Sequence, residues 1–299
     1  MRTCIIFNPA AKGEKAGQLR RHLGKIGSQS TLKQTAGVED ARRLATEAVR
    51  EGFEIIVAAG GDGTLNEVLN GIADVPDGFE RARLGLLPLG TVNVFARELG
   101  IPRKLEPAWQ TILQAHETRI DLPRVDYHVN GAPARRCFAQ LGGAGLDARA
   151  IELVHWSLKK KIGPLAYVVA GLRALLQPPS KITVTAGRLT ATGELVLVGN
   201  GRRYGGEFKI FPKADMRDGL LDVCIFPRVN WLTLARCGAP LLLRRRLPSK
   251  ITENFQTASF TLAGSSAAPL EVDGEWIGHL PATFSVQRSG LRVIVPREP

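Results

Sequence analysis

The glycine-rich segment 60–67 joins a flexible backbone to a carboxylate, and it reads Gly-Gly-Asp-Gly-Thr-Leu-Asn-Glu. It follows the apolar run 53–59, which predicts a strand, and it leads into apolar residues at helical spacing. A strand, a glycine turn and a helix start together present backbone N–H groups and the helix dipole to a phosphate. We expect Thr64 to be the helix N-cap and Asp62 to face a metal ion or a hydroxyl, because a carboxylate repels a bare phosphate. An ordinary strand-to-helix turn is the alternative.

Two further groups of carboxylates could take part in chemistry. Asp273 and Glu275 flank a glycine between two predicted strands, where they form either a plain hairpin turn or a pair of proton acceptors. The segment 215–222 is rich in aspartate and is either a solvated acidic loop or a metal site. Phosphoryl transfer needs a phosphate cradle, a divalent cation and a group that deprotonates the attacking hydroxyl. The glycine loops, Asp62 as a hard Mg²⁺ ligand and the Asp-Gly-Glu turn match these three needs.

The elements that must position these residues fall into two groups. Over about the first 120 residues, predicted helices alternate with four predicted strands, at 3–7, 31–35, 53–59 and 84–87. Repeated strand–helix units of this length predict a parallel sheet covered by helices, with the ligand-binding loops at the carboxyl ends of the strands. We therefore predict an α/β nucleotide-binding domain over residues 1–122.

After residue 122 the pattern changes to short alternating runs. The pair Asn130-Gly131 favours a hairpin, and a helical stretch from about 147 to 177 follows it. The remaining runs predict strands at 182–185, 194–198, 221–226, 259–262, 270–273 and 283–287. These patterns predict a mainly antiparallel β-sandwich domain with helices over residues 123–290. The segment 291–299 is a candidate strand that rejoins the first domain.

The charge and the apolar stretches indicate where the protein acts. Its 40 Lys and Arg against 28 Asp and Glu give a formal charge of +12, which favours anionic partners, but no nucleic-acid-binding motif is present. Four widely spaced cysteines and the lack of a signal-peptide layout predict a reduced, cytoplasmic protein. The apolar stretches 165–176 and 232–243 are too short to span a membrane. With the basic run 244–246, they predict reversible, peripheral binding at the anionic inner membrane surface.

Several motifs follow one another in a recognisable order. They are Asn8-Pro9; Gly60 to Asn66; Pro88-Leu89-Gly90-Thr91 with Asn93, Phe95, Ala96 and Arg97; Gly142 to Asp147; Lys161-Ile162-Gly163 with Ala166-Tyr167; Asp218 to Val223; and Asp273-Gly274-Glu275. In this order and spacing, the chain resembles the bacterial members of the diacylglycerol kinase catalytic-domain family over nearly its whole length. These lipid kinases are related to sphingosine and ceramide kinases and, more distantly, to NAD kinases.

The resemblance implies a role for each candidate residue. ATP is the implied phosphoryl donor, and its implied contacts are Asn8, Pro9, Ala10, Ala11, Lys12, Thr35, Gly61, Asp62, Gly63, Thr64, Leu65, Asn66, Glu67 and Thr91. Asp62 is also implied to be catalytic. Across the cleft between the domains, Glu275 (or Asp273) is the implied proton acceptor for the lipid hydroxyl. Asp215, Asp218 and the carbonyl of Leu220 are the implied ligands of a structural Mg²⁺ ion.

One departure from the family pattern concerns the loop after the fourth predicted strand. The family usually reads Gly-Thr-Gly-Asn-Asp-Phe, whereas this chain has Val92 and Val94 at the third and fifth positions, which leaves one metal or catalytic-network contact open. We predict an ATP- and Mg²⁺-dependent kinase that phosphorylates a free hydroxyl of diacylglycerol or a similar lipid. Two alternatives are a soluble-substrate kinase resembling NAD kinase and an inactive basic protein that binds anionic lipid. The sequence does not identify the lipid, and it leaves the oligomeric state open, a dimer included.

Overall fold

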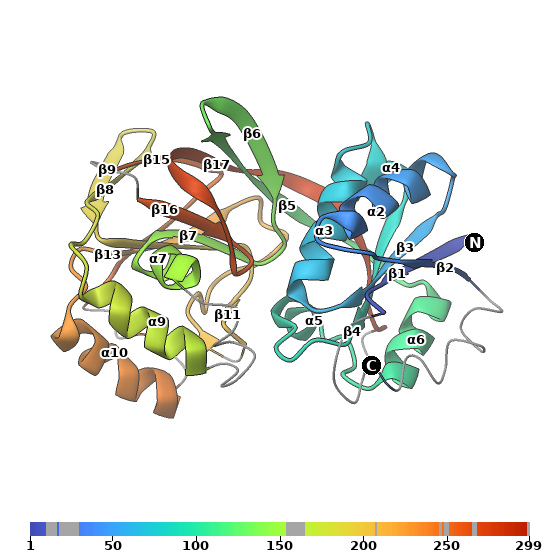
Figure 1. The fold of residues 1–299 in the computed structure, drawn as a ribbon, viewed down its shortest axis with the longest axis horizontal. Helices are drawn as coiled ribbons and strands as arrows, with labels where there is room; N and C mark the ends of the chain where they lie inside the picture. The colour runs from blue at the N-terminus through green and yellow to red at the C-terminus, as the bar shows by residue number, and fades with distance from the viewer. Residues whose placement is uncertain are drawn as a thin grey trace. The chain divides into compact units, whose positions relative to one another are not determined.

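The computed structural model describes residues 1–9, 17, 30–153, 165–206, 208–244, 247, 251–264 and 268–297. The chain divides into two compact units (Figure 1). Unit 1 comprises Met1–Leu122 and Gln287–Pro299, and unit 2 comprises Pro123–Val286. Among the described residues, no helix is long and apolar enough to cross a membrane.

Unit 1 is built on parallel strands with helices between them. Its elements are β1 (Thr3–Phe7), β2 (Thr31–Gln34), α2 (Asp40–Arg50), β3 (Ile55–Gly60), α3 (Asp62–Ala73), α4 (Gly78–Arg81), β4 (Arg83–Pro88), α5 (Val94–Glu98), α6 (Leu105–Gln114) and the start of β5 (Glu117–Val129). The strands pair in the order β2-β1-β3-β4, all parallel, and Val293 near the end of β17 (Glu275–Ile294) pairs with Leu84 of β4. This confirms the predicted α/β fold with a parallel sheet.

The apolar strands of unit 1 are buried along their length, as expected for a parallel sheet with helices packed on it. Ile5 and Ile6 of β1 and Ile56 and Val57 of β3 are fully buried. The helix α2 turns its apolar side, which includes Ala45, toward α3 and β1. The strands therefore end together at one sheet edge, where the loops that follow them are brought side by side.

The helix α3 begins earlier than the sequence predicts. Gly61 is its N-cap, with an extended backbone (φ −93°, ψ −169°), and Asp62 is its first residue. Thr64 lies in the first turn, so the prediction that Thr64 is the N-cap is wrong. The helix therefore begins three residues sooner, and the Asp62 carboxylate lies at the positive end of the helix dipole, where a negative charge is favourable.

Unit 2 is mainly antiparallel. Its elements are the rest of β5, β6 (Ala132–Cys137), β7 (Leu141–Gly145), α7 (Leu146–Leu153), α9 (Leu165–Leu175), β8 (Ile182–Ala186), β9 (Leu189–Gly193), β10 (Leu195–Gly199), β11 (Arg203–Tyr204), β12 (Phe208–Lys209), β13 (Leu221–Phe226), α10 (Trp231–Arg244), β14 (Glu253–Thr257), β15 (Ser259–Gly264), β16 (Pro269–Val272) and the first part of β17. One run of strands is β14-β13-β10-β7-β16-β17, and a second is β9-β8-β15-β17. The predicted hairpin is present, with Asn130 (φ 51°) and Gly131 (φ 81°) in its turn.

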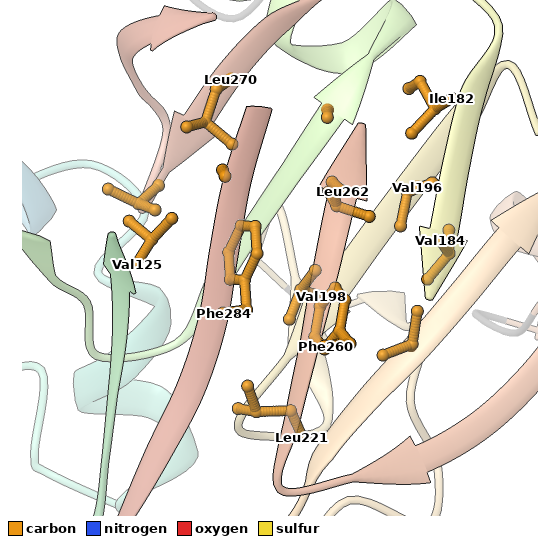
Figure 2. Close-up of a cluster of buried hydrophobic side chains, with 14 of the residues drawn as sticks. Val125, Ile182, Val184, Val196, Val198, Leu221, Phe260, Leu262, Leu270 and Phe284 are labelled. Atoms are coloured by element: carbon orange, nitrogen blue, oxygen red, sulfur yellow. The ribbon is translucent and has the colours of Figure 1, made fainter. Parts of the chain in front are cut away.

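The core of unit 2 lies where side chains from both runs of strands meet (Figure 2). Phe284 of β17 stacks on Phe260 of β15, with ring centroids 5.1 Å apart, and contacts Phe138 edge-on. Val196 and Val198 of β10 enter this core from the other run. Contact between the two runs across a shared apolar core confirms the predicted β-sandwich.

The central strand β10 is buried on both faces, which explains its unbroken apolar sequence. Side chains alternate between the two faces of a strand. Val196 and Val198 point into the sandwich core, whereas Leu195 and Leu197 belong to a second cluster that includes Cys237 of α10. The strand therefore shows no polar alternation, and the helix α10 packs on its outer side.

A buried acidic residue lies on β16, between two residues that point into the sandwich core, Leu270 and Val272. Glu271 of β16 is fully buried; its Oε2 accepts a hydrogen bond from the Gly274 N–H (2.9 Å), and its Oε1 has no hydrogen-bond partner among the described residues. Burial raises the pKa of Glu271 well above its usual value, and the negative charge of Asp147 raises it further. Burial also raises the pKa of Asp147, which accepts a hydrogen bond from the Tyr204 hydroxyl. Glu271 therefore keeps its proton to a higher pH in the folded protein than in the unfolded chain.

We predict that Glu271→Gln raises the melting temperature more at pH 8 than at pH 5. As pH rises past about 4.5, the usual pKa of glutamate, the unfolded chain ionises first, so the wild type loses stability with rising pH through this group. Glutamine has no proton to lose, and each unit of pKa shift corresponds to about 1.4 kcal/mol. Thermal melts of both proteins at the two pH values measure the difference. Glu253→Gln, at an exposed position of β14, separates burial from net charge, and an equal gain at both pH values for Glu271→Gln would contradict the prediction.

Candidate active site

The predicted nucleotide-binding residues of unit 1 lie in the loops at one edge of its sheet. Backbone bonds tie these loops to neighbouring strand ends: the Thr35 N–H donates to the Phe7 carbonyl (2.9 Å), and the Leu89 N–H donates to the Gly60 carbonyl (2.9 Å). Of the residues the sequence assigns to this site, the following lie in or next to these loops: Asn8, Pro9, Thr35, Gly61, Asp62, Gly63, Thr64 and Thr91. Ala10, Ala11 and Lys12 lie outside the described residues.

Two of these loops approach each other so closely that only glycine fits. A Cβ atom on Gly90 would lie 2.6 Å from the Cα of Gly61, closer than real Cβ contacts allow. Asn93 holds the Gly90 loop, because its Oδ1 accepts from the Gly90 N–H (3.1 Å) and its Nδ2 donates to the Gly90 carbonyl (2.6 Å). Asn93 itself adopts a left-handed backbone (φ 52°) and is buried. Gly90 is thus needed to pack the loops, whatever ligand binds beside them.

The carboxylate of Asp62 joins these two loops. Its Oδ1 accepts a hydrogen bond from the N–H of Val94 (2.9 Å), at the start of α5. The side chain of Val94 is buried, so the position where the family usually has aspartate is occupied here by an apolar contact. Of the two positions that this hydrogen bond joins, 62 and 94, only position 62 therefore carries an acidic side chain in this chain.

Three other predicted contacts take part in helix packing. Leu65 and Asn66 are buried, and the Asn70 amide donates to Asn66 Oδ1 (3.1 Å) within α3. Glu67 Oε2 accepts from the N–H of Ala41 at the start of α2 (3.0 Å). These side chains stabilise α3 and its contact with α2, whereas Asp62, Gly63 and Thr64 stay partly exposed.

In unit 2 the Asp-Gly-Glu segment forms the turn between β16 and β17. Asp273 (φ 48°) and Gly274 (φ 81°) both adopt the left-handed conformation, which suits a tight two-residue hairpin turn. Asp273 thus lies in the turn, whereas the sequence pattern placed it at the end of the strand. Its carboxylate accepts three backbone N–H bonds: Oδ2 from Ala139 (2.8 Å), and Oδ1 from Gln140 (3.0 Å) and Leu141 (3.2 Å).

Glu275 is the second carboxylate of the turn, and it is partly exposed. Its side chain is 37% exposed, and its Oε2 accepts a hydrogen bond from Nη2 of Arg136 on β6 at 2.5 Å. The Arg136 side chain is only 11% exposed. The turn therefore separates two roles: both oxygens of Asp273 are engaged by backbone amides, whereas Glu275 reaches solvent while paired to a cation.

The predicted metal loop of unit 2 contains several short carboxylate contacts. Asp215 Oδ1 accepts from the Arg217 N–H (3.1 Å), and Asp218 Oδ1 accepts from the Leu220 N–H (2.8 Å). Burial raises the pKa of Asp222, and the charge of Asp218 raises it further. Within the described ranges, no group of three His, Cys, Asp or Glu side chains is close enough to hold a metal ion. Binding of Mg²⁺ by Asp215, Asp218 and the Leu220 carbonyl stays a prediction.

Two residues at the turn carried no signal in the sequence. Arg136 is 139 positions from Glu275, and Glu271 lies in a strand whose residues are all buried. The pairing of β16 with β17 shifts in register between Leu270 and Glu271, which the sequence did not indicate. Alternation along β6 could have indicated that Arg135 and Arg136 face opposite sides, but it could not name their partners.

Comparison with known proteins places this arrangement in a family. The model of the diacylglycerol kinase catalytic domain matches residues 2–125, and the model of the YegS C-terminal NAD kinase beta sandwich-like domain matches residues 142–295. Two proteins named diacylglycerol kinase, from Staphylococcus aureus strains RF122 and JH9, are 30% and 31% identical to this chain. Each alignment covers 99% of this chain and 93% of the relative.

The fold agrees with this assignment. A crystal structure of a diacylglycerol kinase from Bacillus anthracis matches with a TM-score of 0.78 at 22% identity, covering 99% of this chain and 97% of the other. At that identity the match concerns the fold alone. Together with the two family models and the S. aureus relatives, it shows that the chain belongs to the diacylglycerol kinase family and is a diacylglycerol kinase-like enzyme.

Proposed function

We propose that this enzyme transfers the γ-phosphoryl group of ATP to a free hydroxyl of diacylglycerol or a similar lipid. The observation that carries the proposal is the Asp-Gly-Glu turn, in which Asp273 is held by three backbone amides and Glu275 stays accessible. A plain hairpin turn needs neither a triply bonded aspartate nor a glutamate paired to a nearly buried arginine. Family membership supplies the reaction class, and the turn supplies a group that can accept the hydroxyl proton.

The loop edge of unit 1 is the proposed ATP site. Backbone N–H groups of a glycine turn and the start of α3 favour the phosphates, and the other proposed contacts come from the loops after β1, β2 and β4. Mg²⁺ usually binds through one or two carboxylates together with substrate phosphates, which fits the single carboxylate of Asp62. Bound there, the ion would neutralise charge on the phosphate oxygens.

Glu275 is the proposed proton acceptor. As the lipid hydroxyl attacks, its proton passes to the Glu275 carboxylate, a bond forms from the hydroxyl oxygen to the γ-phosphorus, and the bond to the departing ADP oxygen breaks. Asp273 serves to orient the turn, because a carboxylate that already accepts three N–H bonds is poorly placed to take up a proton.

Incubation with radiolabelled ATP, Mg²⁺ and a panel of lipids in mixed micelles tests this function directly. Label that enters the organic phase with diacylglycerol or a related hydroxyl lipid supports the proposal. NAD belongs in the same panel, since labelled NADP would favour a soluble-substrate kinase, and no labelled product from any acceptor would favour a protein that only binds lipid.

We predict that Asp62→Asn lowers the turnover number by about 100-fold or more while the protein stays folded. Asparagine keeps the shape and can still accept the Val94 N–H, but it removes the charge proposed to face Mg²⁺ and the phosphates. Steady-state kinetics and a thermal melt check both parts. Turnover close to the wild type in a folded variant would show that the segment 60–67 is only structural.

Glu275→Gln and Asp273→Asn are expected to differ in a diagnostic way. Glu275→Gln should lower turnover by about 100-fold with ATP binding nearly unchanged, since a proton acceptor acts on the hydroxyl. Asp273→Asn replaces one of the two acceptor oxygens by an NH₂ group, so at least one of the three hydrogen bonds from the amides of residues 139–141 is lost and the melting temperature should fall as well. Steady-state kinetics and thermal melts of both variants measure these differences. Loss of ATP affinity with a normal maximal rate in Glu275→Gln would reverse its assignment.

The lipid is proposed to be reached at an anionic membrane surface. The helix α10 begins with two exposed apolar side chains, Trp231 (56% exposed) and Leu232 (57% exposed). Arg228 and Arg236, close by in sequence, are exposed as well. Exposed aromatic and aliphatic side chains beside arginines suit the interface of a bilayer with anionic head groups. Of the basic run 244–246, residues 245 and 246 lie outside the described residues.

We predict that the wild type sediments with vesicles that contain anionic lipid and that raising the salt weakens this binding, because exposed charges are screened. The double variant Trp231→Ser, Leu232→Ser should bind such vesicles several-fold more weakly. Leu113→Ser, which alters an exposed leucine of unit 1 (44% exposed), is the matched control and should bind like the wild type. Equal, salt-independent binding to neutral and anionic vesicles would contradict the membrane part of the proposal.

A further inference from the structure

Two adjacent arginines on β6 face opposite sides of the strand and have different partners. Arg135 is 61% exposed and pairs with Asp126, which lies directly across the hairpin in β5, at 2.6 Å. Arg136 is 11% exposed and pairs with Glu275 at 2.5 Å. The two residues have the same charge and the same strand, so they differ in the side of the strand that they occupy and in the partner that each one meets.

The pair of Arg136 and Glu275 lies in a region dominated by carboxyl groups. Asp273 precedes Glu275 by two residues, and Glu271 lies buried beneath the turn with its Oε2 on the Gly274 N–H. Asp147 and Tyr204 are the next ionisable groups around Glu271. Negative charge on these groups would favour the protonated form of a neighbouring carboxyl, whereas the guanidinium of Arg136 favours the ionised form.

A nearly buried guanidinium also has a geometric effect. Arginine keeps its charge at any pH of interest, and its planar group holds a carboxylate in a fixed orientation. The Arg136 guanidinium is nearly buried, so loss of its carboxylate partner would leave this positive charge poorly solvated, which favours keeping the pair together. Arg136 is therefore suited to hold the Glu275 carboxylate both in place and ready to accept a proton.

We propose that Arg136 is a positioning residue for the phosphoryl transfer: it orients the Glu275 carboxylate and keeps it ionised. This inference rests on the proposed function, because it takes Glu275 as the proton acceptor. Arg136 need not touch the substrate. Its effect passes through Glu275, and this gives the proposal two signatures that a merely structural arginine lacks, namely a shift in the pH profile and dependence on Glu275.

The experiment measures kcat/KM for the lipid against pH in the full-length protein, with saturating ATP and Mg²⁺. In Arg136→Gln we expect the acidic limb of the profile to move up by about 1 pH unit, because the ionised carboxylate has lost the guanidinium that lies 2.5 Å from it. Arg136→Lys keeps the charge and should leave the limb near the wild-type pH, with a lower kcat because the planar group is gone. Arg135→Gln is the matched control and should match the wild type throughout, although it also breaks an ion pair on β6.

The double variants separate this inference from the function on which it rests. If Arg136 acts through Glu275, adding Arg136→Gln or Arg136→Lys to Glu275→Gln should cause no further loss of kcat. The role of Arg136 would be overturned if the losses of kcat from the two substitutions multiplied in the double variant. It would also be overturned if the acidic limb of Arg136→Gln stayed at the wild-type pH. If Arg136→Gln fails to fold, the double-mutant cycle of Arg136→Lys and Glu275→Gln tests the same role. A Glu275→Gln variant with normal turnover would instead overturn the proposed function itself.

Discussion

The three hydrogen bonds from backbone amides to Asp273 are the constraint on which the site in unit 2 depends. They connect the turn between β16 and β17 to the segment 139–141, which leads from β6 into β7. Asp273 and Gly274 both have left-handed backbones, and aspartate tolerates that conformation less well than glycine does. The three hydrogen bonds from backbone N–H groups offset this cost. They also fix the point at which β17 begins and hence the position of Glu275.

The buried ionisable side chains around this turn lower the stability of the folded protein. Within the described part of the chain, one oxygen of the buried Glu271 lacks a hydrogen-bond partner, and a largely buried arginine is paired to Glu275. Apolar side chains in the same places would give a more stable sandwich, since burial of ionisable groups is costly. The same low-dielectric surroundings strengthen the interaction between Arg136 and Glu275, which suits a carboxylate that must stay oriented while it awaits a proton. In unit 1, by contrast, glycine packing and the bond from Asp62 to Val94 hold the loops with little buried charge.

Much of this could be predicted from the sequence, because hydrophobic periodicity depends on local neighbours. The parallel sheet of unit 1, the antiparallel sandwich and the Asn130-Gly131 turn all follow from such patterns. The start of α3 at Asp62 could not be predicted, because three glycines permit several entry points into the helix. The ion pair of Arg136 with Glu275 joins residues 139 positions apart and depends on how β6 meets β17. The sequence around Arg135 and Arg136 does not indicate which of these two adjacent arginines is buried.

Amide hydrogen exchange at Ala139, Gln140 and Leu141, followed by NMR, shows whether the Asp273 carboxylate holds the turn. We expect slow exchange at all three amides in the wild type and in Glu275→Gln, because the Asp273 carboxylate accepts their hydrogen bonds in both proteins. In Asp273→Ala the three amides should lose protection together, while amides in the centre of β10 keep theirs. Fast exchange at these amides in the wild type, or protection that survives the loss of the Asp273 carboxylate, would contradict the claim that this side chain holds the turn.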